Sequence, residues 1–156
     1  MQSPDSLSQV AEFHQIFQHP ILEKPQIPNF DRCELRVELI SEELKELQEA
    51  IENNDLLEVA DALCDLQYVL SGAVLEFGLG DKFKELFDEV QRSNMSKACA
   101  TEEEALATVK HYNITGTESY FKKDGDRYLV FRSGDNKTLK SVNYSPANLK
   151  DILSHK

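Results

Sequence analysis

Hydrophobic residues recur at helical spacing along residues 1–114. The clearest amphipathic segment is residues 31–53, whose apolar face carries Ile40, Leu44, Leu47 and Ile51. Residues 56–77 are apolar around nearly the whole circumference of a helix, which is typical of a buried helix. The same periodicity predicts three further helices, over residues 5–18, 81–97 and 101–112.

Cap and turn residues delimit these segments. Asp55, with Glu58 three residues later, has the spacing of a capping box, and the segment that begins at Thr101 repeats this spacing. Gly78 is expected to end the second long helix. The three prolines of residues 19–30 predict an extended connector between the first two helices.

Beyond Gly116 the pattern changes from helical to strand-like. The segment SYFKKDGDRYLVF predicts a β-hairpin that turns at Asp124-Gly125, and residues 138–142 are a candidate third strand. Ser145-Pro146 is typical of the start of a short helix, expected over residues 146–153. We therefore expect an all-α helical bundle of four to five helices with a small C-terminal β-hairpin appendage.

The formal charge of −11 is unevenly distributed along the 156 residues. Residues 1–114 hold 9 basic and 23 acidic residues, whereas residues 115–156 hold 8 basic and 5 acidic ones. This step predicts a helical domain over residues 1–114 and a small tail over residues 115–156 that packs on it. The acidic balance argues against a nucleic-acid partner, because a phosphate-backbone binder needs a basic face.

Composition also bears on the cellular setting. No apolar run approaches the roughly 18–20 residues of a membrane span, and residues 1–10 lack the features of a signal peptide. Cys33, Cys64 and Cys99 are odd in number and form no CxxC pair, which favours reduced thiols. We expect a cytoplasmic protein without a membrane partner.

Residues 42–65 contain nine acidic side chains and one lysine. A solvated acidic face is the usual interpretation of such a run, and Glu42 fits it because it lies away from the apolar arc. At about 100° per residue, however, Glu43 falls inside the apolar arc and Glu46 falls at its edge. Arg36, almost two turns earlier, also faces inward.

The next helix carries its charges in one narrow stripe. Glu58, Asp61 and Asp65 form this stripe, and Tyr68 and Gly72 continue it. A glycine inside a helix costs about 1 kcal/mol, and close approach by another group is one reason to keep it. Two neighbouring helices are thus predicted to aim carboxylates at a shared interior point, although Glu58 also has an alternative explanation as a capping residue.

These acids predict a metal site. Unpaired buried carboxylates are costly, and the sequence offers few inward-facing cations, Arg36 and Lys97 among them. Carboxylate oxygens suit a hard divalent ion such as Mg²⁺. The four histidines fall in no ExxH pattern, and no Cys/His cluster exists, which argues against di-iron and zinc sites.

The segment RSNMSK, residues 92–97, adds groups that suit an anionic ligand. Asn94 and Lys97 continue the inward stripe of the fourth helix, and Arg92 lies beside them. An ordinary frayed helix end is the alternative interpretation. Together with a metal–carboxylate site, these groups indicate phosphate chemistry.

Two acidic motifs in order distinguish the chain: EExxE at residues 42–46 and ExxD at residues 58–61. With these motifs and the block DEVQRSNMSK, the chain resembles the all-α nucleoside triphosphate pyrophosphohydrolases over most of residues 30–97. This superfamily includes MazG, dimeric dUTPases and phosphoribosyl-ATP pyrophosphohydrolase. The resemblance implies hydrolysis of an NTP or dNTP to the monophosphate and pyrophosphate, with Mg²⁺ or Mn²⁺ as cofactor and a homodimer or homotetramer as assembly.

The resemblance also implies roles for individual residues. The metal ligands it implies are Glu43, Glu46, Asp61 and Asp65, with Glu42 and Glu58 as a further ligand, base or supporting group. Asp61 and Asp65 compete for the principal role, because DLQYV after Asp65 also matches the text that follows the family's second acid. Asn94 and Lys97 match positions that face the nucleotide or its phosphates.

We therefore expect a magnesium-dependent pyrophosphohydrolase that cleans or balances a nucleotide pool. Glu42, Glu43 and Glu46 are its candidate catalytic residues, and Arg36, Tyr68, Arg92, Asn94 and Lys97 its candidate substrate-binding residues. The rival hypothesis is a non-enzymatic helical oligomer that acts as an adaptor and whose acids are solvated. A kinase-like enzyme is disfavoured because no GxxxxGK[ST] loop occurs.

Overall fold

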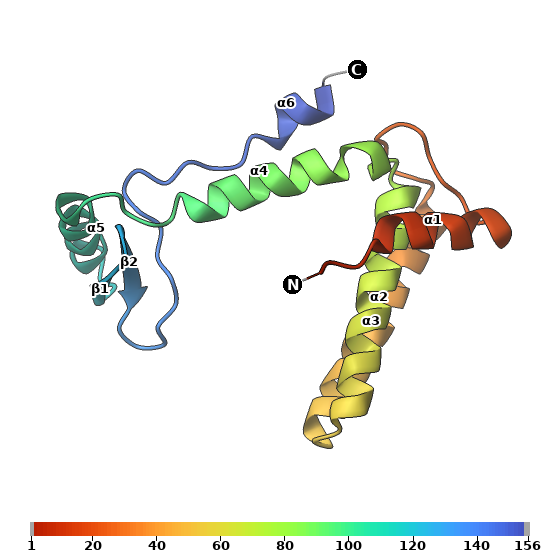
Figure 1. Cartoon of the computed structure of the whole chain (residues 1–156), viewed down its shortest axis with the longest axis horizontal. Helices are drawn as coiled ribbons and strands as arrows, with labels where there is room; N and C mark the ends of the chain where they lie inside the picture. The colour runs from red at the N-terminus through yellow and green to blue at the C-terminus, as the bar shows by residue number, and fades with distance from the viewer. Residues whose placement is uncertain (1, 155–156) are drawn as a thin grey trace. The chain divides into compact units, whose positions relative to one another are not determined.

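The computed structural model describes residues 2–154 and is mainly helical, as Figure 1 shows. Its elements are α1 (Ser6–Ile16), α2 (Phe30–Glu52), α3 (Leu56–Glu76), the 3-10 turn η1 (Gly80–Lys82), α4 (Phe83–Met95), α5 (Glu102–Ile114), β1 (Ser119–Asp124), β2 (Arg127–Arg132) and α6 (Leu149–Ser154). The predicted all-α fold with a small C-terminal hairpin is confirmed. The chain divides into two compact units, Met1–Phe83 and Lys84–Lys156.

In the first unit, α2 and α3 form a helical hairpin, and α1 contacts α3. Asn29 caps α2 by accepting a hydrogen bond from the backbone N–H of Arg32. Asp55 caps α3 as predicted, because its carboxylate accepts from the backbone N–H groups of Leu57 and Glu58. The backbone N–H of Asp55 itself donates to Ala50 O rather than to Glu58, as a capping box would require. These caps fix where the two long helices begin, and therefore which of their side chains face each other.

The proline-containing connector lies against the C-terminal end of α3. The backbone N–H of Leu22 donates to Leu75 O at 3.0 Å, and that of Gln26 donates to Phe77 O at 3.1 Å. Gly78 follows with a φ of +68°, and a Cβ there would lie 2.0 Å from the carbonyl oxygen of Lys24. Only glycine fits both the left-handed backbone and this close approach. The connector therefore covers the end of α3 where Glu76 is buried.

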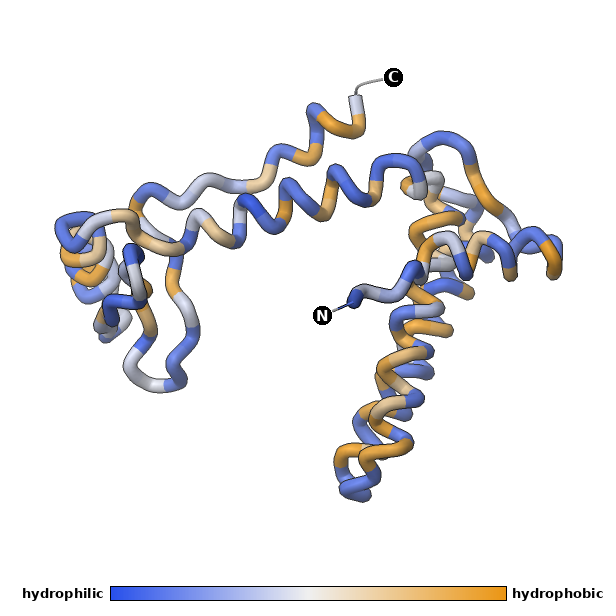
Figure 2. The backbone as a smooth tube through the Cα atoms, in the orientation of Figure 1, coloured by the Kyte–Doolittle hydropathy of each residue, from blue (hydrophilic) through white to orange (hydrophobic). Residues whose placement is uncertain are grey.

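The prediction that residues 56–77 form a helix buried on all sides is wrong for the N-terminal half of α3. Leu56 is 81% exposed and Leu57 is 76% exposed, whereas Val74 and Leu75 near the other end are buried. Apolar positions run along both helices of the hairpin in Figure 2. Further exposed apolar residues on α2 and α3 are Val37, Leu44, Ile51, Leu63 and Leu70. The single chain thus leaves a large part of this apolar surface uncovered.

The second unit has a small core of its own, formed by Cys99, Ala105, Val130 and Leu139. The backbone of Cys99 pairs with that of Tyr128 in β2, so the segment before α5 is joined to the hairpin. This unit includes α4 as well as the hairpin, so the predicted boundary near residue 115 lies inside it.

Three local predictions in the second unit need correction. The antiparallel register pairs Asp124 with Arg127, so the two-residue turn is Gly125-Asp126 rather than Asp124-Gly125. Within the described residues, 138–142 form no strand but only one bridge, between Thr138 and Phe131. The last helix begins at Leu149, three residues after Pro146.

No single helix of the described chain combines the length and the apolar character that crossing a membrane requires.

Candidate functional site

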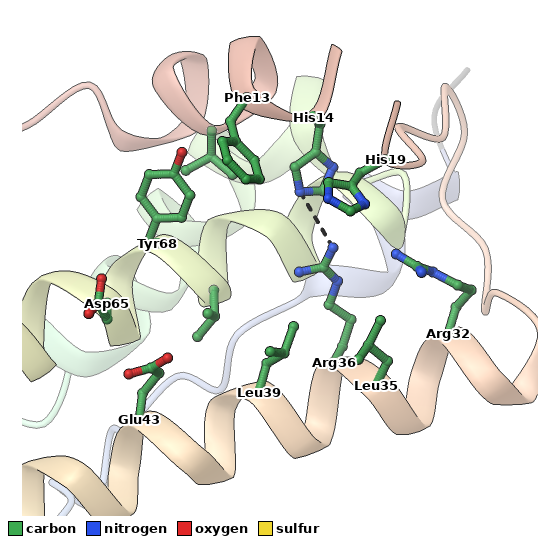
Figure 3. Close-up of a pocket in the computed structure, with 12 residues that line it drawn as sticks. Phe13, His14, His19, Arg32, Leu35, Arg36, Leu39, Glu43, Asp65 and Tyr68 are labelled. Atoms are coloured by element: carbon green, nitrogen blue, oxygen red, sulfur yellow. Dashed lines mark hydrogen bonds between the residues drawn. The ribbon is translucent and has the colours of Figure 1, made fainter. Parts of the chain in front are cut away.

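A pocket of about 350 Å³ lies between α1, α2 and α3, all within the first unit. Glu43 from α2 and Asp65 from α3 face each other at one end of it, as Figure 3 shows. Arg36 and His14 lie at the other end, and the side chains between the two ends are mainly apolar or aromatic. Four of the predicted site residues, Arg36, Glu43, Asp65 and Tyr68, therefore share one pocket.

The acidic end carries concentrated negative charge. Burial raises the pKa of the half-buried Glu43 carboxyl, and the charge of Asp65 raises it further. Glu46, Glu42 and Asp61 act on Glu43 in the same direction. Four other predicted acids thus lie close enough to repel the charge of Glu43, which favours either a proton on Glu43 or a cation beside it.

The chemistry of these side chains fits a hard divalent cation, because all of them offer carboxylate oxygens. Within residues 2–154, however, no three side chains of His, Cys, Asp or Glu are grouped closely enough to hold a metal ion. The expectation that Glu46, Asp61 and Asp65 point into a buried interior is wrong, because all three are exposed. The part of α3 that carries Asp61 and Asp65 lacks the cover that the sequence pattern suggested. Glu58 is also exposed, one turn after the cap of α3.

The opposite end of the pocket holds a buried ionic cluster that sequence reasoning found only in part. Glu76 is 1% exposed and Arg36 is 7% exposed. The carboxylate of Glu76 accepts hydrogen bonds from Arg36 Nη2 and from Nη2 of Arg32, and Arg32 Nε donates to Oε2 at 2.9 Å. Burial by itself would raise the pKa of Glu76, but the hydrogen bonds from the two arginines outweigh it and lower this pKa.

His14 completes the cluster from α1. Its ring Nδ1 lies 3.0 Å from the carbonyl oxygen of Pro20, and its Nε2 lies 3.4 Å from Arg36 Nη2. Burial lowers the pKa of His14, so the neutral form is favoured. The two partners then assign the proton to Nδ1, which donates to Pro20, while Nε2 accepts from Arg36. His14 therefore fixes the arginine without adding charge.

Aromatic side chains line the pocket between its two ends. Phe13 of α1 and Tyr68 of α3 pack edge to face with their ring centroids 5.6 Å apart. His19 stacks on the other side of Phe13 at 5.8 Å. Leu39 of α2 supplies an apolar floor between Arg36 and Glu43. Such a surface can accommodate a flat heterocyclic ring.

Gly72 permits the close packing of this cluster, as its place in the stripe of α3 suggested. A Cβ at this position would lie 2.7 Å from Arg36 Nη1 and 3.1 Å from His14 Nε2. In an ordinary helix, Gly→Ala stabilises by about 1 kcal/mol. Here we expect Gly72→Ala to lower the free energy of unfolding by about 1–3 kcal/mol through overpacking. Urea denaturation measures this change. A variant more stable than wild type would show that Arg36 and His14 move aside for the added methyl group at little cost.

Arg92, Asn94 and Lys97 lie in the second unit. Arg92 donates to both carboxylate oxygens of Glu89, and also to Ser145 Oγ and Pro146 O at 3.0 Å each. The hydrogen bonds from Arg92, together with the backbone N–H of Asn148, lower the pKa of Glu89 to about 2. Lys97 Nζ donates to Asn94 Oδ1 at 2.8 Å. Their assignment to phosphate binding stays a prediction.

Sequence reasoning missed Glu76, Arg32, His14 and Phe13 as members of the site. A signal for two of them was present in the helical spacing. Glu76 follows Gly72 by four residues and so extends the stripe of Asp65, and Arg32 precedes Arg36 by four residues. The apolar spacing of residues 5–18 predicted a helix that includes Phe13 and His14, but nothing in that spacing indicated which other helices it contacts.

Comparison with known proteins gives two matches. The family model described as phosphoribosyl-ATP pyrophosphohydrolase matches residues 10–94, a span that includes most of α1, the whole of α2 and α3, and every residue of the pocket. Uncharacterized protein L479 of Acanthamoeba polyphaga mimivirus is 26% identical, over 92% of this chain and 94% of its own length. The family match covers more than half of the chain. The chain therefore belongs to the phosphoribosyl-ATP pyrophosphohydrolase family, within the MazG-like superfamily of all-α pyrophosphohydrolases.

Proposed function

We propose that the protein is a magnesium-dependent nucleoside triphosphate pyrophosphohydrolase. It converts an NTP or dNTP to the monophosphate and pyrophosphate, and so cleans or balances a nucleotide pool. The observation that carries this proposal is the pair Glu43 and Asp65, which face each other at one end of the pocket, together with the raised pKa of Glu43. Membership of a family of pyrophosphohydrolases, whose superfamily generally uses divalent metals, supports it.

In this proposal Glu43 and Asp65 hold the metal, with Glu46 and Asp61 as further ligands. Asp65 is a stronger candidate than Asp61 for the principal metal ligand. It lines the pocket, and its charge raises the pKa of Glu43 more than that of any other acid does. When bound, Mg²⁺ neutralises phosphate oxygens and makes water a better nucleophile. Glu42, or Glu46 where it does not bind the metal, would accept a proton from the attacking water, and Glu58 would support the site from the start of α3.

The rest of the pocket receives the remainder of the nucleotide. Tyr68 and Phe13 offer ring faces and edges for the base. Phosphoribosyl-ATP, the compound after which the family is named, should be included among the tested substrates because it also carries a phosphoanhydride chain. Pyrophosphate release across all common NTPs and dNTPs, with Mg²⁺ or with EDTA, tests the proposal. Release from none of them would favour the adaptor hypothesis.

The proposed assembly is a homodimer or homotetramer that covers the apolar surface of α2 and α3. Leu57 and Leu63 on α3 are 76% and 52% exposed, and Leu44 on α2 is 58% exposed. Large exposed apolar patches are characteristic of interaction surfaces. We expect sedimentation equilibrium to give two or four chains, and Leu63→Glu to shift the protein toward monomer. A monomeric wild-type protein at micromolar concentration would contradict this assembly.

A further inference from the structure

The buried cluster at the end of the pocket has one more positive charge than negative. Glu76 supplies one carboxylate, whereas Arg32 and Arg36 supply two guanidinium groups. His14 contributes no charge in the neutral form that its partners favour. Arg36 is the buried one of the two arginines, because the side chain of Arg32 is 27% exposed. A buried, incompletely neutralised guanidinium is costly, so this arrangement favours an additional anion.

Arg36 retains an unused donor in this cluster. Among the described residues, its hydrogen bonds to Glu76 and to His14 both leave from Nη2. Its Nε atom is buried and has no hydrogen-bond partner within that part of the chain. The side chain of Arg36 is only 8% exposed, and the residue lines the pocket. A buried donor without an acceptor is uncommon in folded proteins, and this one belongs to a side chain that lines the pocket, so an acceptor supplied by a ligand would satisfy it.

The cluster also holds Arg36 in one position. Glu76 binds the same Nη2 group that contacts His14, and Gly72 leaves room for Nη1 at a distance that a Cβ would prevent. We propose that Glu76 is a positioning residue that fixes Arg36, and that Arg36 binds a phosphate-type anion at the end of the pocket opposite Glu43 and Asp65. Glu76 itself touches no substrate in this arrangement. That this anion is part of the substrate rests on the proposed function. The existence of the anion site does not depend on that function.

The spacing of the two ends favours an extended ligand. Arg36 and Glu43 lie seven residues apart on α2, which corresponds to about 10 Å along the helix axis. One end attracts an anion and the other attracts a cation, with Leu39 between them. A ligand with a phosphate group at one end and a cation-bound phosphate chain at the other matches this polarity.

Binding of inorganic pyrophosphate in the presence of EDTA tests the anion site without any catalysis. We expect saturable binding to the full chain by titration calorimetry, with Arg36→Gln weakening the affinity at least tenfold. Lys45→Gln is the matched control, because it removes the same charge from an exposed position of α2. Its affinity is expected to stay within twofold of wild type. Equal affinities of Arg36→Gln and wild type would overturn the proposal.

Two further variants separate positioning from charge. Arg36→Lys keeps the charge but removes Nε and the planar fork, and it is also expected to bind pyrophosphate at least tenfold more weakly. Glu76→Gln makes the cluster more positive, so a purely electrostatic role predicts tighter binding. If Glu76 instead positions Arg36, the substitution releases Arg36, and pyrophosphate binds more weakly. Tighter binding by Glu76→Gln, or unchanged binding by a folded Arg36→Lys protein, would overturn the assignment.

A nucleoside without phosphate distinguishes the anion from a base that Arg36 could contact instead. Adenosine, cytidine, guanosine and uridine are expected to bind Arg36→Lys and wild type equally. A nucleoside whose affinity depends on Arg36 would overturn the anion assignment. Pyrophosphate binding that depends on Arg36 in a protein that hydrolyses no nucleotide would disprove the proposed function and retain the anion site.

Discussion

Glutamine in place of Glu43 is expected to reduce pyrophosphate release by at least about a hundredfold and, at the same time, to stabilise the metal-free protein. The two effects have one cause. Burial raises the pKa of Glu43, and the charges of Asp65, Glu46 and other acids raise it further, so its charge is unfavourable until a cation arrives. Removing that charge removes both the repulsion and the metal ligand. Thermal unfolding in EDTA and a pyrophosphate assay in Mg²⁺ measure the pair.

The pH dependence has a defined sign. Because the folded-state pKa of Glu43 lies above its ordinary value, the folded protein binds a proton more tightly than the unfolded chain does. The stability of metal-free wild type therefore decreases as the pH rises through the raised pKa, and Glu43→Gln lacks this contribution. Glu38→Gln, an exposed change on α2, is the control for both readouts. Full activity of Glu43→Gln would contradict the assigned role.

Alanine in place of Glu76 is expected to lower the free energy of unfolding by about 3–5 kcal/mol, because removal of one partner leaves buried charges uncompensated. Arg36 has no other carboxylate among its hydrogen-bond partners in the described chain. Urea denaturation measures the loss. Glu49→Ala is the matched control on an exposed helix pair with Lys45, and it is expected to cost about 0.5 kcal/mol or less.

The same carboxylate predicts acid sensitivity. The pKa of Glu76 is lowered in the folded protein, so its contribution to stability is complete above the ordinary pKa of a glutamate. This contribution is lost as the pH falls through the lowered value. A loss in Glu76→Ala no larger than in Glu49→Ala would show that the arginines find compensation elsewhere.

The long helices and their ends could be predicted from local sequence. Regular apolar spacing and the caps at Asp55 and Thr101 depend on residues within one or two turns, and both caps form as expected. Helical spacing also indicated that Arg36 and Glu43 share a face of α2, and the structure places both in one pocket.

The rest of the site depends on contacts between segments distant in sequence. His14 reaches Arg36 across 22 residues, and Arg32 reaches Glu76 across 44. No periodicity within one helix records such a pairing. The sequence overestimated the burial of α3. Apolar residues on all sides of a helix show that its surface is unfavourable in water, but they do not show whether the same chain covers that surface. Here Leu56 and Leu57 remain largely exposed.

The placement of the last helix failed for a related reason. Ser145-Pro146 has the composition of a helix start, yet both residues are used by Arg92, which binds the hydroxyl of one and the carbonyl of the other. Helix α6 then begins at Leu149, after the backbone N–H of Asn148 has donated to Glu89. Long-range hydrogen bonds thus displaced a local preference.

The account depends most on a divalent cation held by acids of α2 and α3, and calorimetric titration of nucleotide-free protein with Mn²⁺ measures this directly. We expect saturable binding to wild type that weakens at least about tenfold in Glu43→Gln and in Asp65→Asn, while Glu38→Gln binds as wild type does. Equal binding by all four proteins would contradict the account, because the acids around the pocket would then hold no specific ion.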